Sequence, residues 1–337
     1  MIPDDKLHAQ LPHTLRQLDL PALGELYRGK VRDNYSRGEK IVMITTDRVS
    51  AFDHVLGTIP FKGEVLSRLT AFWFDKVKDI APTHLLDVPD PSVMVVKKAK
   101  ALPIEIVIRG YITGSLWRDY QAGKAGAYGI EWPKGLRKDQ AFEKPVITPS
   151  TKAEYGKHDE PISEQEILAK RIVAPEIWRE ATAIAHRLFA RGQEWAKKQG
   201  LILVDTKYEM GIVAEEDGSA GRRGEAKAEP SKGKLVVIDE IHTPDSSRYW
   251  VAKGYEDRFA KGVDQEMLDK ENIRQWLIKE HGFSGHGKPP PLTDEVRVML
   301  ARKYIEVFEL LTGQPFTSEV GSVAARIEKN LKAKGYG

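Results

Sequence analysis

The sequence predicts an α+β protein of two lobes, in which short strands are combined with a few long helices. Apolar runs of strand length recur between turn-forming residues, for example IVMI at 41–44 and LVVI at 235–238. Long stretches with helical spacing of apolar side chains lie at 175–200 and 293–311. The 337 residues also suffice for two domains of ordinary size. We expect residues 1–115 to form the first lobe and residues 116–337 the second.

The first lobe is predicted to be a small sheet with one helix packed on it. Residues 25–47 (ELYRGKVRDNYSRGEKIVMITTD) indicate two strands joined around SRGEK. Residues 63–77 (GEVLSRLTAFWFDKV) space their apolar side chains as a helix does. Residues 92–117 (SVMVVKKAKALPIEIVIRGYITGSLW) indicate two further strands, with 97–103 between them.

The second lobe is predicted to begin with long ordered loops or a flap at 121–165, which is rich in Gly, Pro and charge. A helix follows at 175–200, because Pro175 suits its first turn and Gly200 its end. Residues 200–213 and 234–241 then indicate a hairpin whose tip, 214–233, has almost no apolar content. A helical segment around NIRQWLIKEH and a capped helix at 293–311 complete the chain.

Composition excludes several classes of function. The 52 basic and 49 acidic side chains leave a formal charge of only +3, which gives no support for binding nucleic acid. The absence of cysteine excludes disulfides, thiolate nucleophiles and cysteine-ligated zinc. Neither a signal peptide nor an apolar run of about 18 residues is present, so we expect a soluble, cytoplasmic protein with no membrane partner. The nine histidines have no metal-binding spacing, and core or surface roles are expected for them.

The segment LVDTKYE places charge on one face of a strand. Alternation directs Asp205, Lys207 and Glu209 to the same side, directly after an apolar run. An ordinary solvated sheet face is the alternative explanation. The neighbouring strand candidate KLVVIDEI also ends in acids, however, and this repetition favours a functional site.

Pairing of these two strands would bring Glu209 and Asp239 side by side. Two carboxylates so close repel each other unless a cation or a proton lies between them. Magnesium commonly takes one or two carboxylates and completes its shell with phosphate oxygens and water. We therefore expect a Mg²⁺ site at Glu209 and Asp239, with Glu240 as the alternative to Asp239 because the register is unknown.

The segment RGKVR offers a place for nucleotide phosphates. Gly29 permits close approach of the backbone, while Lys30 and Arg32 share one strand face. The segment is not a Walker A loop, and the chain contains no GxGxxG motif. A solvated strand edge is the alternative interpretation.

Two segments combine an arginine with small hydroxyl residues. They are RGYITGS, with Arg109 and Ser115, and TPDSSR, with Arg248. Guanidinium groups together with hydroxyl and backbone donors suit a phosphate monoester. Turn-forming residues would explain either segment alone, but two such segments favour an anion site.

These segments, taken in order, resemble the SAICAR synthetase family (phosphoribosylaminoimidazole-succinocarboxamide synthase). The resemblance extends over about residues 21–285, and the length and the STKAEYGKHDE segment are similar to the longer, yeast-like members. The matching segments are LYRGKVRD (26–33), TTDRVSAFD (45–53), IRGYITGSLW (108–117), TPSTKAEYGKHDEPIS (148–163), GLILVDTKYEMG (200–211) and DEIHTPDSSRYW (239–250).

The resemblance implies a two-lobed fold related to ATP-grasp, with a nucleotide cleft between the lobes. It implies that ATP drives the joining of the imidazole carboxylate CAIR to L-aspartate, giving SAICAR, ADP and phosphate in purine biosynthesis. A carboxylate resists attack by an amine, so phosphorylation of CAIR to an acyl phosphate is the most economical route. We expect a monomer whose partners are these small molecules.

The resemblance also implies roles for individual residues. Those expected to meet the ATP phosphates are Lys30 and Arg32, and those expected to hold magnesium are Glu209 and Asp239. Asp205 and Lys207 would orient the reacting groups. The CAIR site would contain Arg109, Ser115, Asp245 and Arg248. For aspartate the matching segments suggest Ser50, Asp53, Lys152 and Asp159.

Two other functions remain open from the sequence. One is a different small-molecule kinase or carboxylate ligase on the same scaffold, because ATP and magnesium features do not identify the acceptor. The other is a module that binds RNA or phosphoprotein through its basic loops, which the balanced charge disfavours.

Overall fold

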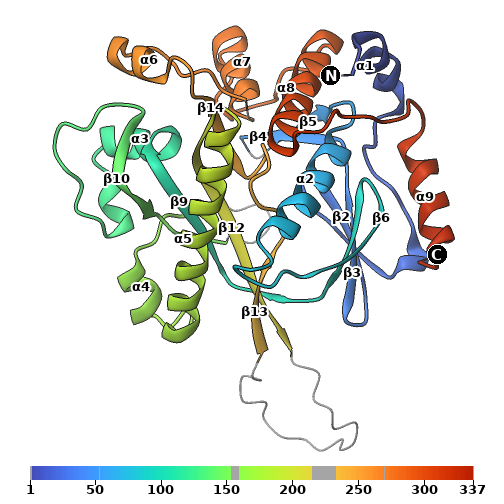
Figure 1. Ribbon diagram of the computed structural model, residues 1–337, viewed down its shortest axis with the longest axis horizontal. Helices are drawn as coiled ribbons and strands as arrows, with labels where there is room; N and C mark the ends of the chain where they lie inside the picture. Colours follow the sequence, from blue (N-terminus) through green and yellow to red (C-terminus); the bar gives the residue numbers. More distant parts are fainter. Residues whose placement is uncertain (1, 53, 153–158, 215–232, 269, 337) are drawn as a thin grey trace, which may run out of the picture.

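The computed structural model describes residues 2–52, 54–152, 159–214, 233–268 and 270–336. Two large antiparallel sheets lie side by side with helices packed around them (Figure 1). The α-helices are α1 (Asp4–Gln10), α2 (Lys62–Lys76), α3 (Gly114–Gln121), α4 (Glu164–Ala169), α5 (Pro175–Lys198), α6 (Tyr255–Lys261), α7 (Glu271–His281), α8 (Asp294–Thr312) and α9 (Val323–Ala333). The strands are β1 (Glu25–Arg28), β2 (Arg32–Arg37), β3 (Lys40–Thr45), β4 (Arg48–Ala51), β5 (His54–Thr58), β6 (Leu85–Asp90), β7 (Val93–Lys97), β8 (Lys100–Ala101), β9 (Ile104–Ile112), β10 (Gln140–Ile147), β11 (Ser150–Thr151), β12 (Leu201–Ala214), β13 (Gly233–Ile238) and β14 (Ser247–Val251).

The first sheet has five strands in the order β1-β2-β3-β7-β6. The predicted turn at SRGEK is confirmed, since β2 and β3 pair directly across it and Gly38 adopts φ 59°. The expectation of two strands at 25–47 is wrong, because this segment forms three. The amide of Gly29 donates to the carbonyl of Arg32 at 2.8 Å, which folds 29–31 into a tight connection between β1 and β2.

The second sheet is centred on β9 and β12, which are direct antiparallel neighbours. The predicted hairpin is confirmed, since β12 pairs with β13. Two expectations are wrong. Residues 114–117 begin helix α3 and do not continue the strand, because Gly114 takes a left-handed φ of 57°. Residues 121–165 are not irregular throughout, because β10 pairs with β9 along part of this segment.

The chain passes from the first sheet to the second between β7 and β8. Strand β9 therefore belongs to the second sheet, although it lies within the expected first lobe. The division at residue 115 stays a prediction. Near the C-terminus, α9 returns to pack against the five-stranded sheet, where Ile327 and Leu331 join Ile44 and Val95 in a buried cluster. Neither α1 nor α9 was anticipated from the sequence.

The long helices lie where the spacing of apolar residues predicted them. Helix α5 packs on β12 and β9, and α2 packs on α8 (Figure 1). Thr293 caps α8 by accepting from the amide of Val296, and Gly313 ends it with φ 67°. Trp73 and Trp178 are buried in this core, as expected from their positions in helical patterns. These helices therefore hold the sheet that carries the polar side chains described below.

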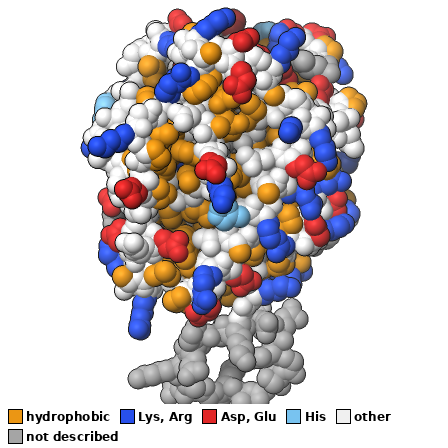
Figure 2. All heavy atoms as spheres, turned by 60° about the vertical axis from the view of Figure 1, so that its left-hand side comes forward, with side chains coloured by type: hydrophobic (Ala, Val, Ile, Leu, Met, Phe, Trp, Pro, Cys, Tyr) orange, Lys and Arg blue, Asp and Glu red, His pale blue; other side chains and the backbone are white. Residues whose placement is uncertain are grey.

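Acidic and basic side chains are interspersed on the face shown in Figure 2, among hydrophobic ones that gather near its middle. This distribution agrees with the small net charge of +3. Among the described residues, every helix is too short or too polar to cross a lipid bilayer.

Candidate active site

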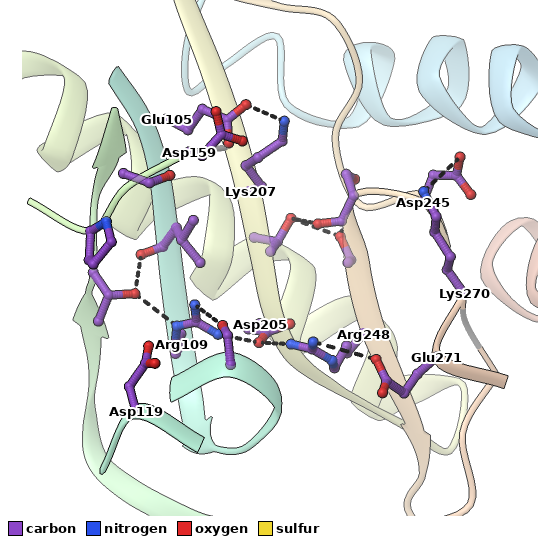
Figure 3. Close-up of a pocket in the computed structure, with 18 of the residues that line it drawn as sticks. Glu105, Arg109, Asp119, Asp159, Asp205, Lys207, Asp245, Arg248, Lys270 and Glu271 are labelled. Atoms are coloured by element: carbon purple, nitrogen blue, oxygen red, sulfur yellow. Dashed lines mark hydrogen bonds and ion pairs between the residues drawn. The ribbon is translucent and has the colours of Figure 1, made fainter. Parts of the chain in front are cut away.

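A cavity of about 500 Å³ opens on the second sheet, where β9, β12 and β14 run side by side. Charged side chains from these strands, from α3 and α7, and from the connections at Asp159, Asp245 and Lys270 surround it (Figure 3). They are Glu105, Arg109, Asp119, Asp159, Asp205, Lys207, Asp245, Arg248, Lys270, Glu271 and Arg274. The structure thus brings together seven residues that the sequence suggested separately, namely Arg109, Ser115, Asp159, Asp205, Lys207, Asp245 and Arg248.

Two arginines converge on one carboxylate at the floor of this cavity (Figure 3). Arg109 Nη1 donates to Asp205 Oδ2 at 3.0 Å, and Arg248 Nη1 donates to the same oxygen at 2.5 Å. Arg109 Nη2 also donates to the Ser115 hydroxyl at 3.2 Å. A Cβ at Gly114 would lie 2.4 Å from Arg248 Nη2, so only glycine lets the guanidinium pass here. Arg248 Nη2 also lies 3.6 Å from Glu271 Oε2, and Arg274 Nη1 lies 3.1 Å from the same oxygen, so three guanidinium groups share two carboxylates and leave one excess positive charge.

Lys207 lies between two carboxylates. Its Nζ is 2.5 Å from Glu105 Oε1 and 2.9 Å from Glu209 Oε1. Burial alone would lower the pKa of Lys207, but Glu209 and Glu105 outweigh burial and raise it far above the ordinary value. Lys207 therefore keeps its proton and acts as a fixed positive charge.

A second, smaller cavity of about 150 Å³ lies next to Glu209. Its wall combines the apolar side chains of Met43, Val96 and Ile238 with polar groups from His84 and Lys152. Burial lowers the pKa of His84 to about 3, so its imidazole is neutral. Because Lys207 lines the first cavity and bonds to Glu209, which lines the second, the two cavities are adjacent along β12.

Glu209 and Asp239 both line this smaller cavity. The register pairs Glu209 with Ile238, so Asp239 follows immediately where β13 ends, in a left-handed conformation of φ 64°. Burial raises the pKa of Asp239, and repulsion from Glu209 and Glu240 adds to this although Arg32 opposes it. Burial would also raise the pKa of Glu209, but Lys207 and Lys152 lower it overall.

These two carboxylates fit magnesium. Two oxygen ligands beside a space for phosphates is the set that Mg²⁺ commonly uses. Among the described residues no group of three His, Cys, Asp or Glu side chains could enclose a metal, so the remaining ligands would come from substrate and water. Glu240 is the poorer candidate, because it does not line this cavity and its carboxylate accepts from the Thr243 hydroxyl at 2.5 Å.

The two residues suggested for ATP phosphates have different surroundings. Arg32 is buried and pairs with Asp239 at 2.7 Å, so it neutralises the carboxylate pair from the interior. Asp239 and Glu240 raise the pKa of Arg32 above its ordinary value despite burial, which lowers it. Lys30 is exposed in the connection between β1 and β2 and does not line either cavity.

The residues suggested for aspartate are spread over both cavities. Asp159 lines the larger cavity and Lys152 the smaller one, where it pairs with Glu209. The Ser50 hydroxyl accepts from Lys270 Nζ at 3.3 Å and so lies at the edge of the larger cavity. Asp53 lies outside the described residues.

Besides Asp119 on α3, sequence reasoning missed four charged residues that line the larger cavity, namely Glu105, Lys270, Glu271 and Arg274. Strand alternation could have found Glu105, because it lies four residues before Arg109 on β9. The other three lie at the start of α7, and their cavity positions depend on contacts between distant segments.

Residues 25–289 match the sequence model of the SAICAR synthetase family. The chain belongs to the SAICAR synthetase family. It is 44% identical over 328 residues to a phosphoribosylaminoimidazole-succinocarboxamide synthase of Legionella pneumophila, covering 96% of this chain and 99% of that relative.

Solved members of the SAICAR synthetase family share the fold. A SAICAR synthase of Saccharomyces cerevisiae, solved in complex with SAICAR, superposes with a TM-score of 0.74 at 30% identity, over 90% of this chain and all of that one. A synthase of Ehrlichia chaffeensis gives a TM-score of 0.63 at 20% identity, over 86% of this chain and 99% of that one. The predicted longer, yeast-like form is confirmed.

Proposed function

We propose that this protein joins CAIR to L-aspartate at the expense of ATP, giving SAICAR, ADP and phosphate. The observation that carries the proposal is the pair Arg109 and Arg248, which share Asp205 in one cavity with Lys207. Family membership supplies the substrates, since the Legionella relative carries the name of this synthase over nearly its whole length.

The two arginines and Ser115 would hold the phosphate of CAIR. Guanidinium groups bind phosphate oxygens through paired, charge-assisted hydrogen bonds. Asp205 fixes both guanidinium groups in place, and together with Arg274 they outnumber the paired carboxylates of Asp205 and Glu271 by one charge. Asp245, which lines the same cavity, would contact the imidazole end of CAIR.

The reacting carboxylate would lie near Lys207. In the first step an oxygen of this carboxylate attacks the γ-phosphorus of ATP, the bond to the bridging oxygen breaks, and ADP leaves. In the second step the neutral amine of aspartate attacks the acyl carbon, phosphate leaves with its bridging oxygen, and the nitrogen loses one proton to water and keeps the other as the amide N–H. The permanently protonated Lys207 supports the negative charge of the transferred group.

ATP would lie in the smaller cavity with its phosphates toward Glu209. The apolar side chains there and the neutral His84 ring suit a nucleotide base. Magnesium held by Glu209 and Asp239 would neutralise phosphate charge. Arg32 and Lys152, which pair with these carboxylates, would then be released toward phosphate oxygens.

The test is the dependence of ADP release on each substrate. With ATP and magnesium present, we expect ADP to be released over many turnovers only when both CAIR and L-aspartate are added, and SAICAR to appear in equal amount by mass spectrometry. ADP release with CAIR alone at the full rate, and no amide product, would favour a kinase instead. A monomeric state, a cytoplasmic location, the relation to ATP-grasp and the absence of nucleic-acid partners stay predictions.

A further inference from the structure

Asp245 is held from the interior of the protein by two side chains that do not line the cavity. Lys62, at the start of α2, is fully buried, and its Nζ lies 2.8 Å from Asp245 Oδ2. Tyr304, on α8, donates its hydroxyl to Asp245 Oδ1 at 2.5 Å. Both carboxylate oxygens are therefore bound from behind, while the carboxylate itself lines the cavity.

Lys270 approaches the same carboxylate from the cavity side (Figure 3). Its Nζ lies 4.0 Å from Asp245 Oδ2, which is too far for a hydrogen bond. Within the described part of the chain, Lys270 Nζ donates to the neutral hydroxyl of Ser50 at 3.3 Å. Lys62 and Lys270 thus compete for one carboxylate, and Lys62 has the shorter contact.

A largely buried lysine is costly to keep charged unless it is paired, because removing its ammonium from water carries a desolvation penalty, and the side chain of Lys270 is only 19% exposed. Besides Asp245 and Lys62, the charged groups that act on Lys270 are Arg274 and Glu240. Burial, together with the positive charges of Lys62 and Arg274, lowers the pKa of Lys270 to about 8 against the opposing effect of Asp245. The ammonium of Lys270 is therefore incompletely neutralised by the protein.

We propose that Lys62 is a positioning residue: it neutralises Asp245 from inside the fold and thereby leaves Lys270 to bind an anionic group of a substrate in the cavity. That group is a carboxylate or a phosphate. The role of Lys270 in substrate binding rests on the proposed function, whereas the effect of Lys62 on Lys270 does not.

The charge effect is tested without substrates. In the intact protein, acetic anhydride labelling followed by mass spectrometry measures how the reactivity of Lys270 depends on pH. In Lys62→Met we expect Asp245 to pair with Lys270 and raise its pKa, so that Lys270 is labelled roughly tenfold more slowly at pH 8. Lys78→Met is the matched control, because Lys78 is exposed and pairs only with Asp75 among the described residues. The same labelling profile for Lys270 in wild type and Lys62→Met would overturn the proposal.

A second variant covers the case in which Lys62→Met does not fold. Tyr304→Phe removes the hydroxyl that binds Asp245 Oδ1 and keeps the ring, so the packing of α8 is preserved. We expect Lys270 to form a closer pair with Asp245 and to be labelled more slowly than in wild type, although less so than in Lys62→Met. An unchanged profile in Tyr304→Phe would count against the proposal.

Steady-state kinetics identifies the anion. Lys62→Met should raise the KM for one substrate roughly tenfold or more, and Lys62→Arg, which keeps the charge, should restore it in part. A rise for L-aspartate assigns a carboxylate to Lys270, whereas a rise for CAIR assigns a group of CAIR. Unchanged KM values for both substrates would contradict the binding role. If wild type releases no ADP with both substrates, the proposed function fails while the labelling result still stands.

Discussion

Arg109 and Asp205 face each other across the neighbouring strands β9 and β12, with Nη1 of the arginine 3.0 Å from Oδ2 of the carboxylate. The backbone register itself pairs these two residues. Arg109 is also held by Thr148, whose hydroxyl accepts from Nε at 2.8 Å. Contacts with Asp205 on β12 and with Thr148 thus fix the plane of the Arg109 guanidinium group before substrate binds.

The first prediction concerns the fixed orientation of the Arg109 guanidinium group. Arg109→Lys keeps the positive charge but cannot bond to Thr148, Asp205 and Ser115 together, since lysine lacks the planar fork. We expect the KM for CAIR to rise roughly 10- to 100-fold, with little change in the KM for ATP. Steady-state kinetics measures both. Arg179→Lys, an exposed change on α5, is the control, and an unaltered KM for CAIR in Arg109→Lys would refute the phosphate site.

The second prediction concerns the magnesium carboxylates. Glu209→Gln and Asp239→Asn each remove a negative oxygen ligand while keeping the size of the side chain. We expect turnover to fall on the order of 100-fold or more, with a higher magnesium requirement and a thermal unfolding temperature close to that of wild type. A magnesium titration of the rate provides the measurement. Near wild-type activity at low magnesium in either variant would exclude that residue as a ligand.

The third prediction is a pH dependence of stability due to Asp47. This carboxylate is buried, and it accepts from the amides of Leu15 at 2.7 Å and Gly63 at 2.9 Å. Burial nevertheless raises its pKa to about 6, above the ordinary value of 3.8. The folded state therefore binds more protons than the unfolded state between these values, and the contribution of Asp47 to stability falls as pH rises from about 4 to about 6.

Urea unfolding of wild type and Asp47→Asn measures this effect. The variant is expected to be less stable at every pH, because its amide group faces two backbone N–H donors. The free-energy difference between wild type and variant should shrink by roughly 2–3 kcal/mol from pH 4 to pH 6. A difference that stays constant over this range would show that Asp47 ionises in the folded protein as it does in the unfolded one, and a difference that grows would show that folding lowers its pKa; either result would contradict the prediction.

Much of the site could be predicted from local patterns. Strand alternation placed Asp205 and Lys207 on one face, and both line the larger cavity. The pairing of β12 with β13 brought Glu209 and Asp239 to one cavity, as the two acidic strand ends suggested. Each side chain of a strand points to one of two faces of the sheet. One strong apolar run therefore decides which face every side chain of that strand takes.

Other parts could not be predicted because they depend on contacts between distant segments. Lys270 acquires its role from Ser50 and Asp245, and nothing in its own helix signals this. Lys62 lies at the start of an amphipathic helix, where a lysine is ordinarily exposed, and only the fold buries it against Asp245. The break between β1 and β2 depends on one hydrogen bond from Gly29 to Arg32, which no periodicity reveals.

The central claim is that the carboxylate of CAIR receives the phosphoryl group before aspartate attacks. CAIR labelled with ¹⁸O in both carboxylate oxygens, incubated with ATP, magnesium and L-aspartate, tests this claim by mass spectrometry of the released phosphate. The account predicts one ¹⁸O atom in each phosphate and one left in the amide carbonyl of the product. Phosphate without ¹⁸O, released together with SAICAR, would contradict it.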